Sequence, residues 1–127
     1  YKLRAMICSV STSGCDAKLA DQVYNYVNNN DVPFSYADAG KGRKWILGIQ
    51  PIDHFESPIA RISINVAVFP HLFTGGSVTH HVHFENGNLY YDVIGVGSGG
   101  TNGLINNYLA EPSFRSGVDA VLKKFAR

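Results

Sequence analysis

Three histidines and two carboxylates are concentrated in residues 77–93, SVTHHVHFENGNLYYDV. The Asn-Gly dipeptide of this stretch is the pair that best supports a two-residue type I′ turn between antiparallel strands. Such a turn sets the register, so His81 lies directly opposite Asp92 and His83 lies opposite Tyr90. Opposed side chains start about 5 Å apart, which permits a hydrogen bond between imidazole and carboxylate. The stretch therefore predicts one titratable sheet face that carries His81, His83, Tyr90 and Asp92.

The alternate positions of the same two strands are predicted to form the buried face of the sheet. This second set is mostly apolar and contains one histidine and one tyrosine. Its members are Val78, His80, Val82, Phe84, Leu89, Tyr91 and Val93.

Two histidines a few ångström apart can act as a general acid and a general base without a metal. Asp92 would orient His81 and favour its protonated form. RNA cleavage needs such a pair, because the 2′-hydroxyl loses a proton as the 5′-oxygen gains one, and a cation must meet the phosphate charge. The run GKGRKW offers Lys41, Arg43 and Lys44 beside an aromatic residue suited to base stacking. A ribonuclease site is therefore the favoured hypothesis, although a solvated turn also fits this basic run.

A glycine-rich bend, GVGSGG at residues 95–100, follows the histidine hairpin. It matches the G-x-G-x-x-G pattern, but a dinucleotide site needs a parallel βαβ unit and this strand comes from an antiparallel hairpin. The glycines favour a sharp turn instead. Ser98, Thr101 and Asn102 are predicted to offer polar groups to a phosphate at the start of a helix beginning near Gly103.

The same histidines also fit a metal site. The H-x-H spacing points His81 and His83 the same way, and Asp92 would be the third ligand. The run GSVTHHVH resembles the metal-binding strand of cupins, but Glu85 follows too early and a double-sheet barrel needs more strands. The favoured hypothesis therefore expects no metal and no cofactor. A face with no site also stays open, since histidine and tyrosine are tolerated on half-exposed strands.

Cys8 and Cys15 are separated by six residues in ICSVSTSGC, which allows a disulfide. Alternatively, Cys15 lies just before a predicted helix, whose N-terminal dipole would lower the pKa of a thiol. A cysteine at a helix start, followed by a histidine and a polar residue on adjacent strands, resembles papain-like cell-wall amidases. Cys15, His81 and Asp92 would then be nucleophile, base and orienting residue. The surrounding SGCDAK lacks the aspartate-cysteine-serine sequence of those enzymes.

Hydrophobic periodicity outlines an α+β fold. Residues 2–8 are predicted to form a strand, and residues 16–29 carry apolar positions at helical spacing. Residues 34–60 look irregular apart from WILGI, and residues 61–69 alternate cleanly as a strand. A helix from residue 113 closes the chain. The expected fold is an N-terminal helix, an antiparallel meander of three to four strands, and C-terminal helices packed on one face.

The composition sets limits on function. At 127 residues with 45% apolar residues, the chain is expected to be one domain over residues 1–127. A net charge of +1 and a pI near 8.0 are too mild to indicate nucleic acid by bulk charge. No apolar run approaches the roughly 20 residues of a membrane span. The chain opens with Tyr1, so a piece of a longer protein or a processed form is expected.

In outline, residues 16–127 are similar to the C-terminal toxin domains of bacterial polymorphic toxins, of the contact-dependent inhibition and Rhs type. The features that carry this resemblance are the size, the helix before a short meander, VTHHVHFENGNLYYDVIGVGSG, and the closing helices. Many such toxins are metal-independent ribonucleases with folds resembling barnase, colicin and RelE nucleases, each paired with an immunity protein.

The resemblance implies a ribonuclease, which is expected to be a monomer, and the histidine hairpin itself predicts His81, His83, Asp92 and Tyr90 as its catalytic residues. It would be delivered into a target bacterial cell, where it would act on RNA in the cytoplasm and be blocked by a cognate immunity protein. The papain-like amidase or peptidase is the alternative. A non-enzymatic secreted binding domain is the third hypothesis. A disulfide between the two cysteines would support it.

Overall fold

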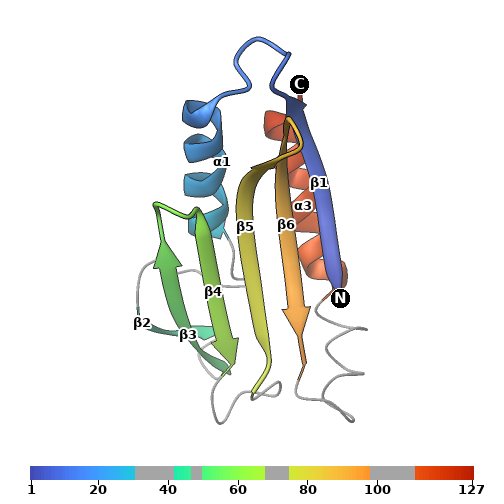
Figure 1. Ribbon diagram of the computed structural model, residues 1–127. Helices are drawn as coiled ribbons and strands as arrows, with labels where there is room; N and C mark the ends of the chain where they lie inside the picture. The colour runs from blue at the N-terminus through green and yellow to red at the C-terminus, as the bar shows by residue number, and fades with distance from the viewer. Residues whose placement is uncertain (31–41, 47–49, 68–74, 98–110) are drawn as a thin grey trace.

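The structure is a computed structural model with six strands and two helices in its described part (Figure 1). It describes residues 1–30, 42–46, 50–67, 75–97 and 111–127. In chain order the elements are β1 (Lys2–Ser9), α1 (Ala17–Asn30), β2 (Gly42–Ile46), β3 (Gln50–Ser57), β4 (Ile62–Ala67), β5 (Ser77–Glu85), β6 (Asn88–Val96) and α3 (Glu111–Phe125).

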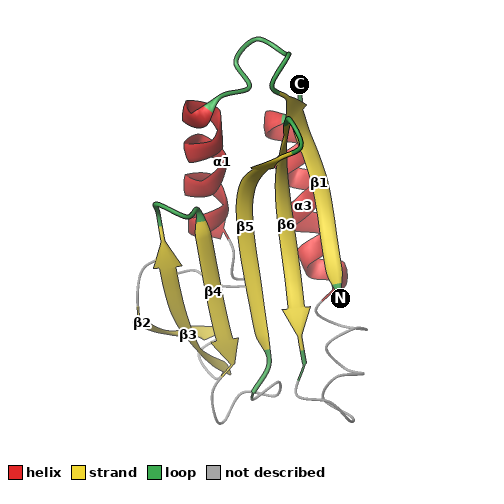
Figure 2. Ribbon diagram, viewed as in Figure 1, coloured by secondary structure: helices red, strands yellow, loops and turns green. Residues whose placement is uncertain are grey.

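The strands form one antiparallel sheet in the order β1-β6-β5-β4-β3-β2. The strands from β2 to β6 follow one another as a meander, and the first strand returns to pair with the last. Both helices lie on the same side of the sheet (Figure 2). The predicted α+β class is therefore confirmed. No helix in the described ranges is long and apolar enough to cross a membrane.

The side of the sheet that carries the helices is called the inner face below, and the opposite side the outer face. Helix α1 packs Leu19, Val23 and Val27 against the inner face, and α3 adds Val118 and Val121. The sheet contributes the apolar members of the predicted buried set together with residues of β1; the buried ones are Leu3, Ala5, Ile7, Val82, Leu89, Tyr91 and Val93. The predicted inner face of the hairpin is confirmed, except that Phe84 at its end is exposed.

The hairpin register is confirmed pair by pair. Residue 81 lies opposite residue 92, residue 83 opposite residue 90, and Asn86 and Gly87 both have positive φ, as a type I′ turn requires. Asparagine and glycine tolerate this left-handed backbone better than other residues do. A local dipeptide therefore fixes which side chains share a face.

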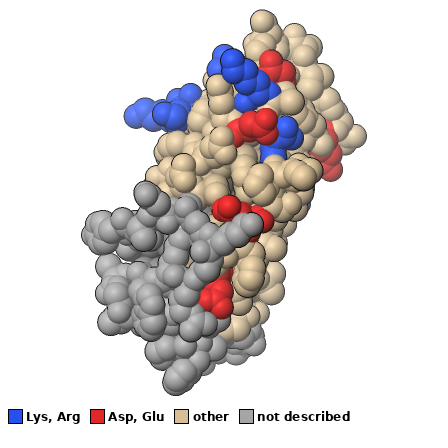
Figure 3. Space-filling model, turned by 90° about the vertical axis from the view of Figure 1, so that its left-hand side faces the viewer, with Lys and Arg blue, Asp and Glu red and all other residues tan. Residues whose placement is uncertain are grey.

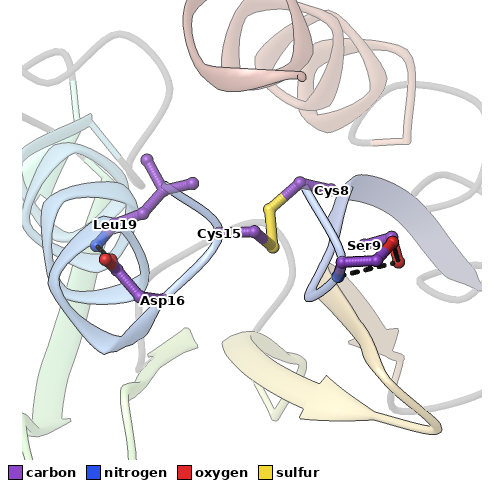
Figure 4. The surroundings of a disulfide bond; sticks show 6 residues. Cys8, Ser9, Cys15, Asp16 and Leu19 are labelled. Atoms are coloured by element: carbon purple, nitrogen blue, oxygen red, sulfur yellow. Dashed lines mark hydrogen bonds between the residues drawn. A yellow bond between two sulfur atoms is a disulfide. The ribbon is translucent and has the colours of Figure 1, made fainter. Parts of the chain in front are cut away.

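A disulfide joins Cys8, at the end of β1, to Cys15, just before α1 (Figure 4). Asp16 caps the helix, because its Oδ1 accepts a hydrogen bond of 3.0 Å from the backbone N–H of Leu19. Both sulfurs are buried in the core on the inner face. A nucleophilic thiolate requires a reduced cysteine, so the hypothesis of thiol catalysis by Cys15 is wrong.

The strand count differs from the expected three to four. β3 was not predicted, because glycine and proline punctuate residues 34–60 and its own sequence, QPIDHFES, has polar residues where a buried strand usually carries apolar ones. The strand predicted over residues 61–69 is β4, and its last two positions lie outside the described residues. So do the last three residues of WILGI and the helix start expected near Gly103.

Candidate functional site

The predicted titratable face lies on the outer face of the sheet. The imidazole rings of His81 and His83 stack with centroids 4.1 Å apart and planes 9° apart. Both rings are partly buried. Tyr90 and Asp92 project from the neighbouring strand β6 on the same side. The structure therefore brings together all four side chains that the sequence proposed as catalytic.

Asp92 is held from two sides. The guanidinium of Arg4 donates to both of its carboxylate oxygens at 2.8 Å, and His83 Nε2 lies 2.7 Å from Oδ2. The expectation that Asp92 orients His81 is wrong in this respect, because the carboxylate leans along β6 and reaches the diagonal histidine. His81 instead hydrogen-bonds the backbone of Ala60.

Burial and these contacts shift the pKa values of His81, Asp92 and Arg4. Burial lowers the pKa of His81, and the nearby His83 lowers it further. Burial alone would raise the pKa of Asp92, but the hydrogen bonds from Arg4 and His83 outweigh burial and hold that pKa below its ordinary value. The hydrogen bonds to Asp92 and Glu85 raise the pKa of Arg4, which stays protonated. Arg4, His81, His83 and Asp92 are called the outer cluster below. It pairs the neutral imidazole of His81 with the imidazole of His83, which contacts the carboxylate of Asp92.

Arg4 was not found from the sequence. Its guanidinium lies 4.4 Å above the ring of Tyr90 and also donates to Glu85 Oε2 at 2.6 Å. Asn88 donates to the hydroxyl of Tyr90 at 3.2 Å. Arg4 reaches this site because β1 pairs with β6, a contact between segments almost ninety residues apart that no local pattern encodes.

The predicted phosphate-binding residues cannot be placed with the histidines. Lys41, Ser98, Thr101 and Asn102 lie outside the described residues. Arg43 and Lys44 belong to β2, whose backbone is described but whose side chains are not. Their role in phosphate binding stays a prediction.

The alternative of a metal site finds little support on the outer face. Both oxygens of Asp92 already accept hydrogen bonds, and the stacked rings of His81 and His83 lie nearly parallel. Within the described ranges, no group of three or more histidine, cysteine, aspartate or glutamate residues is placed to hold a metal ion.

A second group of polar side chains lies on the inner face, where β3, β4 and β5 meet. Four of its members are almost completely buried: His54 is 1% exposed, Ser63 0%, Asn65 7% and His80 1%. Burying a polar group without a hydrogen bond costs about 1–3 kcal/mol, so each of them needs a partner. None of these four residues was predicted from the sequence to have a function.

His54 is the centre of a buried hydrogen-bond network. Its Nδ1 lies 2.6 Å from Asn65 Oδ1 on β4, directly opposite, and its Nε2 lies 3.1 Å from Asn28 Oδ1 on α1. Glu56 Oε2 lies 3.3 Å from the same Nε2 and accepts a hydrogen bond of 2.8 Å from Asn28. Helix α1 and strands β3 and β4 are thereby joined through polar groups.

A polar row runs beside this network across three strands. Glu56 lies opposite Ser63, and Ser63 lies opposite His80, so adjacent side chains of this row start about 5 Å apart. His80 Nδ1 shares a hydrogen bond of 2.6 Å with the hydroxyl of Tyr91. The ring of Phe114 on α3 lies 5.6 Å from the ring of His80. The row therefore ends at an aromatic wall.

The outer face of the same strands has the opposite character. Ile62, Ile64 and Val66 of β4 alternate with the buried Ser63 and Asn65 and are only partly buried. Their neighbour on β3, Phe55, is 57% exposed. The alternation in ISINVA was visible in the sequence, but a period of two does not say which side faces the helices. Only the sheet pairing shows that the polar side faces inward.

Charged side chains are unevenly spread over the side of the molecule that Figure 3 shows. Lys and Arg gather toward one end, and Asp and Glu are scattered along the described surface. The described part of this view therefore has no long basic track of the kind that follows a nucleic-acid backbone.

Comparison with known proteins identifies the fold. No family model matches the chain, and no curated protein matches it significantly. An uncharacterized protein from Bacillus thuringiensis has a TM-score of 0.56 at 13% identity, with 98% of this chain and 97% of that chain covered.

Two enzymes have similar structures. Norcoclaurine synthase from Thalictrum flavum gives a TM-score of 0.56 at 11% identity, covering 97% of this chain and 82% of that one. The Zhui aromatase/cyclase from Streptomyces sp. R1128 gives a TM-score of 0.52 at 13% identity, with 98% of this chain and 91% of that chain covered. This likeness indicates a helix-grip fold, in which a curved antiparallel sheet packs against a long C-terminal helix.

Proposed function

We propose that the protein binds a small organic molecule between the inner face of β3–β5 and the helices. The observation that carries this proposal is the buried polar group on the inner face, which contains His54, Ser63, Asn65 and His80. A satisfied polar network adds little stability over apolar side chains of the same shape. Its presence on the helix side, while isoleucines occupy the outer side, favours a role in binding.

The chemistry of this region suggests the class of ligand. His80 shares a hydrogen bond with Tyr91 and lies beside the ring of Phe114, and Ser63 lies opposite His80, so polar side chains adjoin an aromatic wall. A ligand with an aromatic body and a hydroxyl or carbonyl group fits both parts, since pockets usually combine apolar walls with a few polar groups. Two proteins of similar structure are named as a synthase and an aromatase/cyclase, which agrees with a small-molecule site.

Matched ligand pairs test this proposal. Binding of 2-naphthol and naphthalene, and of acetophenone and ethylbenzene, is measured by NMR titration of the full chain. We expect the oxygen-bearing member of each pair to bind at least about tenfold more tightly, because its oxygen can exchange hydrogen bonds with the polar side chains of this region and the hydrocarbon cannot.

The histidines supply an internal control in the same spectra. Ring signals of His54 and His80 should shift on binding, and those of His81 and His83 should not, because the latter pair lies on the outer face. Shifts confined to the outer pair, or equal binding of hydrocarbon and oxygenated ligands, would contradict an inner site.

The outer cluster supports a second candidate function, metal-independent cleavage of RNA. The favourable observation is the stacked pair of His81 and His83, one neutral and one tethered to Asp92, with Arg4 as the nearby cation. In this proposal the chain is a toxin domain that is delivered into a bacterial cell and inhibited by an immunity protein. Arg4 already serves two carboxylates, so it has less charge to offer a phosphate.

Single substitutions test the ribonuclease proposal. His81→Ala or His83→Ala should each lower the rate of RNA cleavage about a hundredfold or more, which is the usual contribution of a positioned acid or base. Thr79→Ala, a change on the same face without a titratable group, is the control and should keep full activity. Cleavage should persist in excess EDTA. RNA cleavage that is absent in the wild type, or unchanged in both histidine variants, excludes this role.

A further inference from the structure

Strand β1 is the terminal strand on one side of the sheet and pairs only with β6 among the described strands (Figure 1). Tyr1 and Gly95 exchange both backbone hydrogen bonds, at 2.9 and 2.8 Å. Because hydrogen-bonding direction alternates along an antiparallel strand, the backbone groups of Lys2, Arg4 and Met6 point away from β6. An open edge of this kind can accept an additional strand.

A groove runs along this edge between β1 and α3. Its lining combines three apolar residues with three cationic residues and one acidic residue. The lining consists of Lys2, Leu3, Arg4, Arg115, Val118, Asp119 and Leu122. The chain itself uses one end of the edge, since the backbone N–H of Arg127 donates to the carbonyl of Ile7 at 2.9 Å.

A second copy of this chain is a poor occupant. Antiparallel self-pairing centred on Arg4 would place that residue against its own copy and Lys2 against Met6 of the other copy. Like charges directly opposed across two strands are destabilising. Lysine and arginine on an edge strand thus oppose self-association while leaving the edge open to a partner of opposite charge.

We propose that this groove binds an extended acidic segment of a partner protein, which adds to the sheet as a strand beside β1. Side chains of an added strand alternate between the two faces. Those on the outer face would place a carboxylate beside Lys2, because the guanidinium of Arg4 is already paired with Glu85 and Asp92. Those on the inner face would place apolar groups over Leu3 and against Val118 and Leu122. Main-chain hydrogen bonds would supply affinity, and this alternation would supply specificity.

The test uses an eight-residue peptide that alternates Glu and Val, added to the full chain and followed by NMR and hydrogen exchange. The backbone amides of Lys2, Arg4 and Met6 should become protected, and those of β2 should not. A peptide with Lys in place of Glu should bind about tenfold more weakly or worse, because opposite charges attract and like charges repel across the pair. Equal binding of the two peptides would overturn the proposal.

Two matched variants separate strand addition from a general attraction of charges. Methylating the peptide nitrogens that face β1 should weaken binding about tenfold, because two or three hydrogen bonds are lost, and methylating the alternate nitrogens should not. Lys2→Glu should weaken the Glu peptide severalfold and strengthen the Lys peptide. Insensitivity to methylation, dimerisation through β1, or protection of these amides by an RNA oligonucleotide instead of the acidic peptide would each overturn the proposal.

Discussion

The two faces of the sheet use polar residues in different ways. On the outer face, Arg4 and His83 both contact the buried carboxylate of Asp92 and tie β1 to the histidine hairpin. On the inner face, His54 and His80 are buried where an antiparallel sheet usually carries apolar side chains. Arg4 and His83 remain partly exposed to water around the carboxylate of Asp92, whereas His54, Ser63 and His80 are almost completely buried. This difference teaches that burial, more than the presence of histidine, marks the candidate binding site.

The largest expected effect tests which residues form the core. Leu89→Ala on the inner face should lower the free energy of unfolding by about 2–5 kcal/mol, because it empties a fully buried position. Ile64→Ala on the outer face should cost about 1 kcal/mol or less, since its side chain is only partly buried. Urea unfolding measures both values. An equal cost would mean that the outer face of β4 is also packed as a core.

An intermediate effect on stability tests the contacts of Asp92 with Arg4 and His83. Asp92→Ala should lower the free energy of unfolding by about 2 kcal/mol, because Arg4 and His83 lose a shared, buried acceptor. Glu85→Ala removes the more exposed carboxylate that also contacts Arg4 and should cost less than about 1 kcal/mol. Urea unfolding of both variants at neutral pH provides the comparison. If both changes cost the same, Asp92 is not the centre of the outer cluster.

The smallest expected effect is a pH dependence of the outer cluster. The folded pKa of Asp92 is lowered, so its contribution to stability is full above about pH 4, the unfolded pKa, and is lost as pH falls through the folded pKa. The folded pKa of His81 is also lowered, so stability also declines as pH falls from about 6.5 through that folded pKa.

Two measurements check these signs. An NMR titration should place the pKa of His81 below 6.5, and Asp92→Asn should move it lower still, because the carboxylate favours the charged imidazole. The same variant should remove the contribution of Asp92 below about pH 4, while the decline due to His81 still begins near pH 6.5 and extends to lower pH. A pKa of His81 above its ordinary value would mean that Asp92, not burial, controls this residue.

The sequence predicted what depends on local signals. The Asn-Gly turn gave the register of β5 and β6, and helical spacing gave α1 and α3. Both signals act within about twenty residues, where chain connectivity limits the alternatives.

Non-local pairing could not be predicted in this way. Arg4 reaches Asp92 only because β1 crosses to β6, and His54 meets Asn65 only because β3 pairs with β4. The alternation along β4 predicted two faces but not their direction, because a one-residue change of register exchanges them. The inner candidate site was therefore missed, and part of the outer one was found.

The most direct test of the inner binding site replaces a buried polar pair by apolar rings. In the double variant His80→Phe/Tyr91→Phe, both partners of the 2.6 Å hydrogen bond are removed together. Neither the imidazole nor the hydroxyl is then left buried without the other. The measurement is the Kd for 2-naphthol, with the Tm of the same sample as the check on folding. We expect the Tm to change by only a few degrees and the Kd to rise at least about tenfold. An unchanged Kd at an unchanged Tm would contradict a binding role for the inner polar row.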